Sequence, residues 1–311
     1  MPDRAAFDLV VYGTEAPSEL LDCVELSEQG GFGGVWVGDS PVLWRELYVL
    51  LGAAAERTDR IRLGPAVTNP VTRHLAVTAS AIRTLHELSG GRAALGLGLG
   101  ASAVRTVGAK PARLAELERA AADLRALWAG GLGYGGDEPP VPILLGASGP
   151  RMLELCGRIG DGCLAVVGVH PRQLEAARAR LAVGRPTEGF EVVWWVPIAA
   201  AEDGDQARED VKPYVARSLR HPLPAELTPV EQEAAERIRA SYEYGRHLKP
   251  GAHADLVPDE IVADWAVAGT PAECRAQLAA LDLRPGERVG LVPMGREPKR
   301  VQARRLLEGV L

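Results

Sequence analysis

The stretch Gly146-Ala147-Ser148-Gly149 has the residue types of a phosphate-binding turn. It follows an apolar run and is predicted to open a helix, so that backbone N–H groups and the positive end of the helix dipole point at one spot. Ser148 adds a hydroxyl, and Arg151 adds a positive charge in the first helical turn. A helix start that binds nothing is the alternative. A serine hydrolase is not predicted, because Pro150 replaces the second glycine of a Gly-x-Ser-x-Gly elbow.

Three glycines at alternate positions end a second apolar run: Gly96, Gly98 and Gly100. Glycine weakens a strand, so this spacing indicates a backbone that lies against something large. A flat ligand ring and a closely packed piece of the protein itself fit this pattern equally well. No Gly-x-Gly-x-x-Gly pattern opens the next helix, which argues against a Rossmann dinucleotide site.

Metal and thiol chemistry find little support in the sequence. The six histidines lack the paired spacing of a zinc site; they are His74, His86, His170, His221, His247 and His253. The four cysteines have no Cys-x-x-Cys spacing and are expected to be small buried side chains; they are Cys23, Cys156, Cys163 and Cys274. No metal site is therefore predicted.

The composition narrows the range of partners. The chain has 311 residues, of which 47% are hydrophobic and 24% charged, and its formal net charge is -6. Negative net charge without a basic run argues against nucleic acid or an anionic membrane as a partner. The apolar runs are shorter than a bilayer span of about 20 residues, and the first residues lack the apolar core of a signal peptide. A cytoplasmic location and a small-molecule partner are therefore expected.

These residues lie on an alternation of short apolar runs and amphipathic stretches. The runs predict strands at 6–12, 35–37, 61–67, 92–99, 141–145, 161–167, 190–199 and 287–292. Helical patterns between them favour an α/β fold, a (β/α)8 TIM barrel rather than an open doubly wound sheet. Residues 202–267 are charged, helical in pattern and interrupted at Pro213 and later prolines. We expect one domain, 1–311, with a helical insertion before the last strand.

Four segments carry a family resemblance, in the order VWVGDS, LGPAVTNPVTRHLAVTASAIRTLHELSGGRAALGLGLG, PVPILLGASGPRMLELCGRIGDG and AGTPAECRAQL. They are similar to the bacterial luciferase-like superfamily. The resemblance is strongest to the branch that depends on the deazaflavin coenzyme F420, which includes methylenetetrahydromethanopterin reductase. It covers nearly the whole chain and is weakest over residues 202–267.

The resemblance implies a cofactor site at the carboxyl ends of the strands. The ring would lie beside the third and fourth strands, and the phosphate would lie at the turn after the fifth. The implied F420-binding residues are Pro65, Ala66, Val67, Thr68, Asn69, Gly98, Gly100, Ala101, Gly146, Ala147, Ser148, Gly149, Arg151 and Val167. Many relatives have a cis peptide bond in the third strand, which would fall at Gly64-Pro65 or just after it. An ordinary trans proline is the alternative.

The resemblance also implies catalytic residues after the second strand: Asp39, Ser40 and Trp44. Asp39 would hydrogen-bond the ring or donate a proton, unless it only caps the next helix. Alcohol-oxidising relatives carry a histidine at the position of Ser40, whereas reductases have Gly-Asp-Ser here. Two acidic residues of the reductases are replaced by Val10 and Ala101.

An F420-dependent oxidoreductase that moves a hydride to or from a small organic substrate is the leading prediction. Two alternatives stay open: an FMN-dependent monooxygenase with the same fold, and a non-catalytic protein that binds flavin or deazaflavin. The alanine- and leucine-rich second and third helices predict a homodimer face, as the family often has; apolar helices packed only on their own barrel are the alternative. Trp194 and Trp195 are adjacent on a predicted strand, so their side chains should point to opposite faces.

Overall fold

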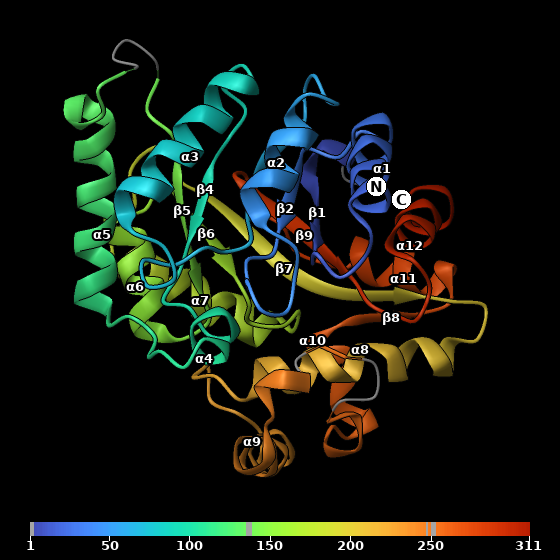
Figure 1. Ribbon diagram of the computed structural model, residues 1–311. Helices are drawn as coiled ribbons and strands as arrows, with labels where there is room; N and C mark the ends of the chain where they lie inside the picture. Colours follow the sequence, from blue (N-terminus) through green and yellow to red (C-terminus); the bar gives the residue numbers. More distant parts are fainter. Residues whose placement is uncertain (1–2, 135–138, 247, 250–252) are drawn as a thin grey trace.

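Parallel strands form a barrel at the centre of the molecule (Figure 1). The computed structural model describes residues 3–134, 139–246, 248–249 and 253–311. His247 lies outside the described residues. The strands are β1 (Phe7–Val11), β2 (Gly34–Val37), β3 (Arg62–Pro65), β4 (Leu95–Leu97), β5 (Ile143–Ala147), β6 (Gly162–Ala165), β7 (Glu191–Ala200), β8 (Val267–Gly269) and β9 (Glu287–Pro293). Their order is β3-β2-β1-β9-β7-β6-β5-β4, and isolated bridges between Leu63 and Ala93 and between Thr68 and Leu97 join the two ends. The predicted TIM barrel is confirmed.

Helices follow most strands and cover the outside of the barrel. The main ones are α1 (Pro17–Gln29), α2 (Leu47–Ala55), α3 (Leu75–Leu88), α5 (Leu114–Ala126), α6 (Pro150–Ile159), α7 (Pro171–Val183), α11 (Pro271–Ala279) and α12 (Lys299–Arg305), and a short α4 (Ser102–Thr106) follows β4. The two chain ends lie side by side (Figure 1), where Arg4 Nη2 donates a hydrogen bond of 2.9 Å to the Leu307 carbonyl. No helix in the described ranges is long and apolar enough to cross a membrane.

The segment predicted as a helical insertion forms α8 (Gly204–Leu219), α9 (Pro229–Ser241) and α10 (Val262–Trp265), which lie together at one end of the barrel, at the bottom of Figure 1. The prediction of a break at Pro213 is wrong, because this residue lies inside α8. A proline inside a helix costs about 3 kcal/mol. Here Tyr214 and Val215 beside it are fully buried, so packing of the helix face outweighs that cost.

A strand that was not predicted begins at the last residue of the predicted insertion. Val267–Gly269 forms β8, which pairs in parallel with Ile198–Ala200 at the end of β7. The long strand β7 pairs with β6 only over Glu191–Trp194, so its carboxyl-terminal part has an edge that β8 occupies. A run of only three residues carries too little periodicity to be predicted as a strand.

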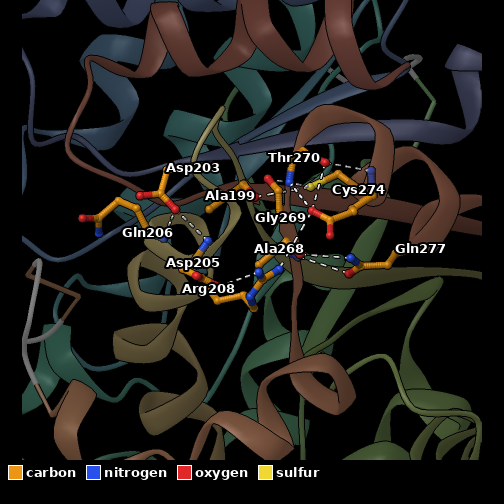
Figure 2. A network of polar contacts seen from close by, with 11 residues as sticks. Ala199, Asp203, Asp205, Gln206, Arg208, Ala268, Gly269, Thr270, Cys274 and Gln277 are labelled. Carbon is orange, nitrogen blue, oxygen red and sulfur yellow. Dashed lines mark hydrogen bonds and ion pairs between the residues drawn. The ribbon is translucent and has the colours of Figure 1, made fainter.

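Figure 2 shows how the N-terminal end of α8 is attached to the barrel. Asp203 caps this helix by accepting hydrogen bonds from the first backbone N–H groups. The Gln277 side chain of α11 bonds both the N–H and the carbonyl of Ala268 in β8, at 3.2 and 2.9 Å. Arg208 of α8 lies 3.9 Å from the carboxylate of Glu273 in α11. This end of α8 is therefore held beside β8 and α11, and its other end reaches over the barrel.

Apolar side chains form two layers, one between the barrel and its helices and one inside the barrel and under α8. The adjacent tryptophans separate into these layers. Trp194 lies in the outer layer, with the Arg178 guanidinium 5.6 Å from its ring centre, and Trp195 lies in the inner one. The prediction that they point to opposite faces is confirmed.

The amino-terminal end of the barrel interior is closed by a buried charge. Asp8 is fully buried, accepts a hydrogen bond of 2.8 Å from Trp36 Nε1, and pairs with the guanidinium of Arg288. A buried carboxylate is stable only with such partners. This end of the barrel is thus filled, and any ligand must enter from the opposite end.

Candidate active site

A cavity of about 610 Å³ opens at the carboxyl ends of the strands. Residues at or just after the ends of β1 to β6 line it, from Tyr12 after β1 to Val166 after β6. The C-terminal part of α8 covers it with Arg217 and Arg220. In (β/α)8 barrels this face carries the active site, because loops from several strands converge there.

Most of the predicted site residues are brought together here, although they come from four separate loops. The cavity is lined by Asp39, Trp44, Ala66, Val67, Gly98, Gly100, Ala101, Gly146, Ala147, Ser148, Gly149 and Arg151. Ala101, which replaces an acidic residue of the reductases, lines the wall, whereas Val10 is buried in the inner apolar layer.

Five predicted residues lie behind the cavity wall. Pro65 is in β3 and pairs with β2, and Ser40 is buried in the turn after β2. Thr68 and Asn69 are also fully buried; the Asn69 side chain accepts hydrogen bonds from the N–H groups of the next turn. Val167 is not among the residues that line the cavity, and its predicted cofactor contact stays a prediction. This residue belongs to the outer apolar layer, and Val166 faces the cavity in its place, because adjacent strand residues point to opposite sides.

The floor of the cavity is formed where β3 ends. The peptide bond between Ala66 and Val67 is cis, whereas the predicted position at Gly64-Pro65 is not, so the bond falls just after that position. The Val67 side chain lies against two glycines: a Cβ atom added at Gly98 would be 2.7 Å from Val67 Cγ2, and one at Gly146 would be 3.1 Å from Val67 Cγ1.

Close packing within the protein therefore explains the alternate glycines. At Gly96 an added Cβ would meet the Pro65 carbonyl oxygen, and at Gly100 it would meet Val104. Glycine is needed at these positions because neighbouring strands and loops approach too closely for a side chain. A ligand ring, which was the other interpretation of the alternate glycines, is not needed to explain them.

The turn after β5 presents an uncapped helix end to the cavity. Gly149 is the N-cap of α6, and no side chain accepts a hydrogen bond there. Ser148 therefore does not cap the helix, and instead lines the cavity with Arg151. Pro222 of the segment after α8 packs at Gly149, where an added Cβ would be 3.2 Å from Pro222 Cβ. The α6 N-terminus is a local concentration of positive potential at this end of the cavity.

Asp39 stands at the cavity wall with its charge already paired. Its Oδ2 atom accepts hydrogen bonds from Thr68 Oγ1 at 2.7 Å and from Arg73 Nη1 at 2.5 Å. Arg73 also donates to Glu46 at 2.7 Å and lies over the ring of Tyr48. Burial alone would lower the pKa of Arg73, but the two carboxylates raise it above its ordinary value. This arrangement suits an oriented hydrogen-bond acceptor better than the proton donor that the resemblance suggested.

Tyr12 and Trp195, which sequence reasoning did not assign to the site, form its opposite wall together with the predicted Trp44. The rings of Tyr12 and Trp44 are 4.6 Å apart, and Trp195 lies below them inside the barrel. The Tyr12 hydroxyl and Trp195 Nε1 are buried without a hydrogen-bond partner among the described residues. The alternation Asp8, Val10, Tyr12 places Tyr12 inward at the mouth of the barrel, so period-2 reasoning along β1 could have found it.

Four basic side chains complete the site. Arg105 comes from α4, and Arg217, Arg220 and His221 come from α8 and the residues after it. Burial lowers the pKa of His221 well below its ordinary value of 6.5, and the three arginines lower it further. The sequence analysis did not indicate these residues; Arg217, Arg220 and His221 lie in the segment where the family resemblance is weakest, and Arg105 lies just after the glycines that end β4. Among the described residues no group of His, Cys, Asp and Glu could hold a metal ion.

The fold and the cavity define a (β/α)8-barrel protein whose ligand site lies at the carboxyl ends of the strands. Comparison with known families agrees with this description. The chain belongs to the luciferase-like monooxygenase family, whose sequence profile matches residues 5–285. The family resemblance inferred from the four sequence segments is thereby confirmed.

Individual relatives cover most or part of the chain. It is 31% identical over 284 residues to 5,10-methylenetetrahydromethanopterin reductase of Archaeoglobus fulgidus, covering 81% of this chain and 82% of that protein. It is 38% identical over 180 residues to F420-dependent glucose-6-phosphate dehydrogenase of Beutenbergia cavernae, covering 49% of this chain and 54% of that protein. The structure of coenzyme F420-dependent tetrahydromethanopterin reductase from Methanopyrus kandleri shares the fold, with a TM-score of 0.75 at 23% identity and coverage of 98% and 97% of the two chains.

Proposed function

We propose that this protein is an F420-dependent oxidoreductase that transfers a hydride between the deazaflavin and a small organic substrate. One observation carries the proposal: a single cavity joins a smooth apolar floor to an uncapped helix N-terminus. The apolar floor suits a planar ring, and the helix N-terminus suits a phosphate. Relatives named as F420-dependent enzymes support the choice of cofactor.

The residues present fit this cofactor. Ala66 and Val67 would support the ring, and the α6 N-terminus with Ser148 and Arg151 would hold the phosphate. The Tyr12 hydroxyl is a buried polar group without a partner among the described residues, and it offers a hydrogen bond to a ligand. When bound, F420 supplies a two-electron hydride carrier.

The chain itself contributes orientation and exclusion of water. Arg73 and Thr68 fix the carboxylate of Asp39 at the wall, so that it can accept a hydrogen bond from a ligand at a defined position. The cover formed by α8 and the wall formed by Tyr12 and Trp44 keep water from the space above the floor. Asp39, Trp44 and Tyr12 are thus the residues that we place beside the reacting atoms.

Titration of the purified protein with oxidised F420 and with FMN, followed by fluorescence, tests the proposal. We expect F420 to bind more tightly, and R151Q to weaken F420 binding by about tenfold because a charged partner of the phosphate is lost. The control R158Q changes an exposed arginine of the same helix, which pairs with Glu118, and should not change binding. Preference for FMN would support a flavin monooxygenase. Binding of neither would overturn the proposal.

We also propose that two copies associate through α2 and α3. Val49 on α2 and Val77 on α3 are 71% and 57% exposed, although both are apolar. The two helices pack against each other, so these side chains lie on neighbouring elements of the surface. An apolar face on neighbouring helices suits a second copy of the chain, because a two-fold axis would pair it with itself.

A further inference from the structure

The cover of the cavity carries more positive charge than the protein neutralises. Arg217 and Arg220 lie one helical turn apart near the end of α8. Arg105 of α4 lines the same cavity and lies 5.1 Å from the centre of the Tyr244 ring, which Arg220 also contacts. None of the three forms an ion pair with a carboxylate in the ranges that the structure describes. Like charges at this spacing repel one another, so their clustering requires a compensating negative charge.

Arg217 is the most informative of these side chains. Its Nε and Nη1 atoms are buried and have no hydrogen-bond partner among the described residues. Its guanidinium lies 4.8 Å from the centre of the Tyr214 ring, which leaves the edge of its plane available for a ligand. A buried guanidinium without acceptors is costly, and a forked pair of N–H groups matches a carboxylate or a phosphate.

Arg220 has a related environment. It lies against the rings of Tyr242 and Tyr244, at 4.6 and 5.0 Å, and donates a hydrogen bond of 3.0 Å to the Tyr244 hydroxyl. Its Nε and Nη2 atoms are buried without a partner within the described part of the chain. Aromatic rings thus hold the guanidinium in place and leave two of its nitrogen atoms for an anion.

The position of Arg217 separates it from the phosphate end of the cavity. Arg217 and Tyr12 both line the cavity, and they lie close enough for the charge of Arg217 to act on the phenol. Five residues further on, Pro222 packs at Gly149 beside the α6 N-terminus. The end of α8 therefore runs from the wall formed by Tyr12 and Trp44 toward the predicted phosphate turn.

We propose that Arg217 and Arg220 bind an anionic group of the substrate, a carboxylate or a phosphate, in the part of the cavity between Tyr12 and α8. This inference rests on the proposed function, because it concerns the second reactant of the same site. It restricts the substrate to small molecules that carry a negative charge away from the carbon that exchanges the hydride. The acidic groups of F420 itself are the other source of such an anion.

Anion binding to the full chain tests this assignment. The protein saturated with F420 is titrated with inorganic phosphate and with neutral trimethyl phosphate, and the tryptophan and F420 fluorescence is followed. We expect phosphate but not trimethyl phosphate to bind. R217Q should weaken phosphate binding by about tenfold or more, and change the Kd of F420 by less than about twofold. The control R208Q lies on the same helix outside the cavity and should leave both unchanged.

Other outcomes have definite meanings. Absence of phosphate binding by the wild type would overturn the inference. It would also be overturned if R217Q weakened the binding of F420 and not the binding of phosphate, because the arginine would then bind the cofactor. R217K keeps the positive charge but loses the forked pair of N–H donors, so we expect an intermediate loss of phosphate affinity. This variant replaces R217Q in the experiment if R217Q does not fold. Phosphate binding is also measured without F420, so failure of the proposed cofactor is distinguished from failure of the anion site.

Discussion

Asp39 and Arg73 come from loops after different strands, and the site depends on their pairing. The carboxylate is almost fully buried, and its Oδ2 atom accepts hydrogen bonds from both Arg73 and Thr68. In sequence, Asp39 was a candidate acid or a helix cap. The structure shows instead a buried ion pair beside the cavity, which fixes a hydrogen-bond acceptor.

A double-mutant cycle measures the strength of this pair. D39N and R73Q should each lower the free energy of unfolding by about 2 kcal/mol, because a hydrogen bond to a charged group is lost near the protein interior. Together they should cost less than the sum, with a coupling of about 1 kcal/mol or more. The exposed pair of Arg57 and Glu25 is the control and should show a smaller coupling. Additive effects of D39N and R73Q in urea unfolding would contradict the interpretation.

Gly98 tests whether the glycines serve packing or a ligand. G98A should destabilise the protein by about 1–3 kcal/mol, because the new methyl group would press on Val67 Cγ2. V67A added to G98A should restore part of that loss by removing the clash. G133A is the control, since no atom of the described residues lies within 4 Å of a Cβ at Gly133. If G98A leaves thermal stability unchanged and only weakens cofactor binding, the ligand interpretation of the glycine is correct.

Among the elements, α9 depends on one buried carboxylate. Glu231 is 1% exposed and closes a capping box with Thr228 at the start of this helix. It also accepts hydrogen bonds from Arg172 of α7 at 2.9 Å and from Trp265 of α10 at 2.9 Å. One side chain thus joins two helices of the cover, α9 and α10, to α7 on the outside of the barrel. Burial raises the pKa of Glu231, but its hydrogen bonds outweigh burial and lower it below the ordinary value of 4.5.

The stability of the cover should therefore depend on pH through Glu231. A carboxyl whose pKa is lowered in the folded state contributes stability above its unfolded value, near pH 4.5, and loses it as the pH falls through the folded value. Hydrogen exchange of residues 229–241 should accelerate over that acid range. E231Q should expose the same segment already at pH 7, whereas E236Q, an exposed change on the same helix, should not. Equal protection in wild type and E231Q at pH 7 would contradict this role.

At the scale of the whole molecule, the cavity lies under the C-terminal end of α8. The helices α2 and α3 lie elsewhere on the barrel (Figure 1). The cover is attached firmly at the N-terminal end of α8, through the contacts around β8 and α11. Association through α2 and α3 would therefore leave the cavity open to its ligands.

Light scattering during gel filtration tests the proposed dimer. The wild type should have about twice the chain mass of 33.1 kDa. V49D together with V77D should give the monomer, because charges in an apolar interface oppose association. V183D is the matched control, since Val183 is a similarly exposed valine on α7. A monomeric wild type at micromolar concentration would contradict the proposal.

The sequence by itself determined the barrel, the helix start after Gly149 and the opposite orientations of Trp194 and Trp195. These features depend on local periodicity, on residues adjacent in the chain and on motifs, all of which are visible in one sequence. Only the tertiary structure decided that Asp39 is paired with Arg73, that Val67 occupies the space left by Gly98, and that Arg217 and Tyr12 line the same cavity. The physical reason is that these contacts join side chains far apart in the chain. Closure of the barrel and the docking of α8 bring them together, and neither event has a local signature.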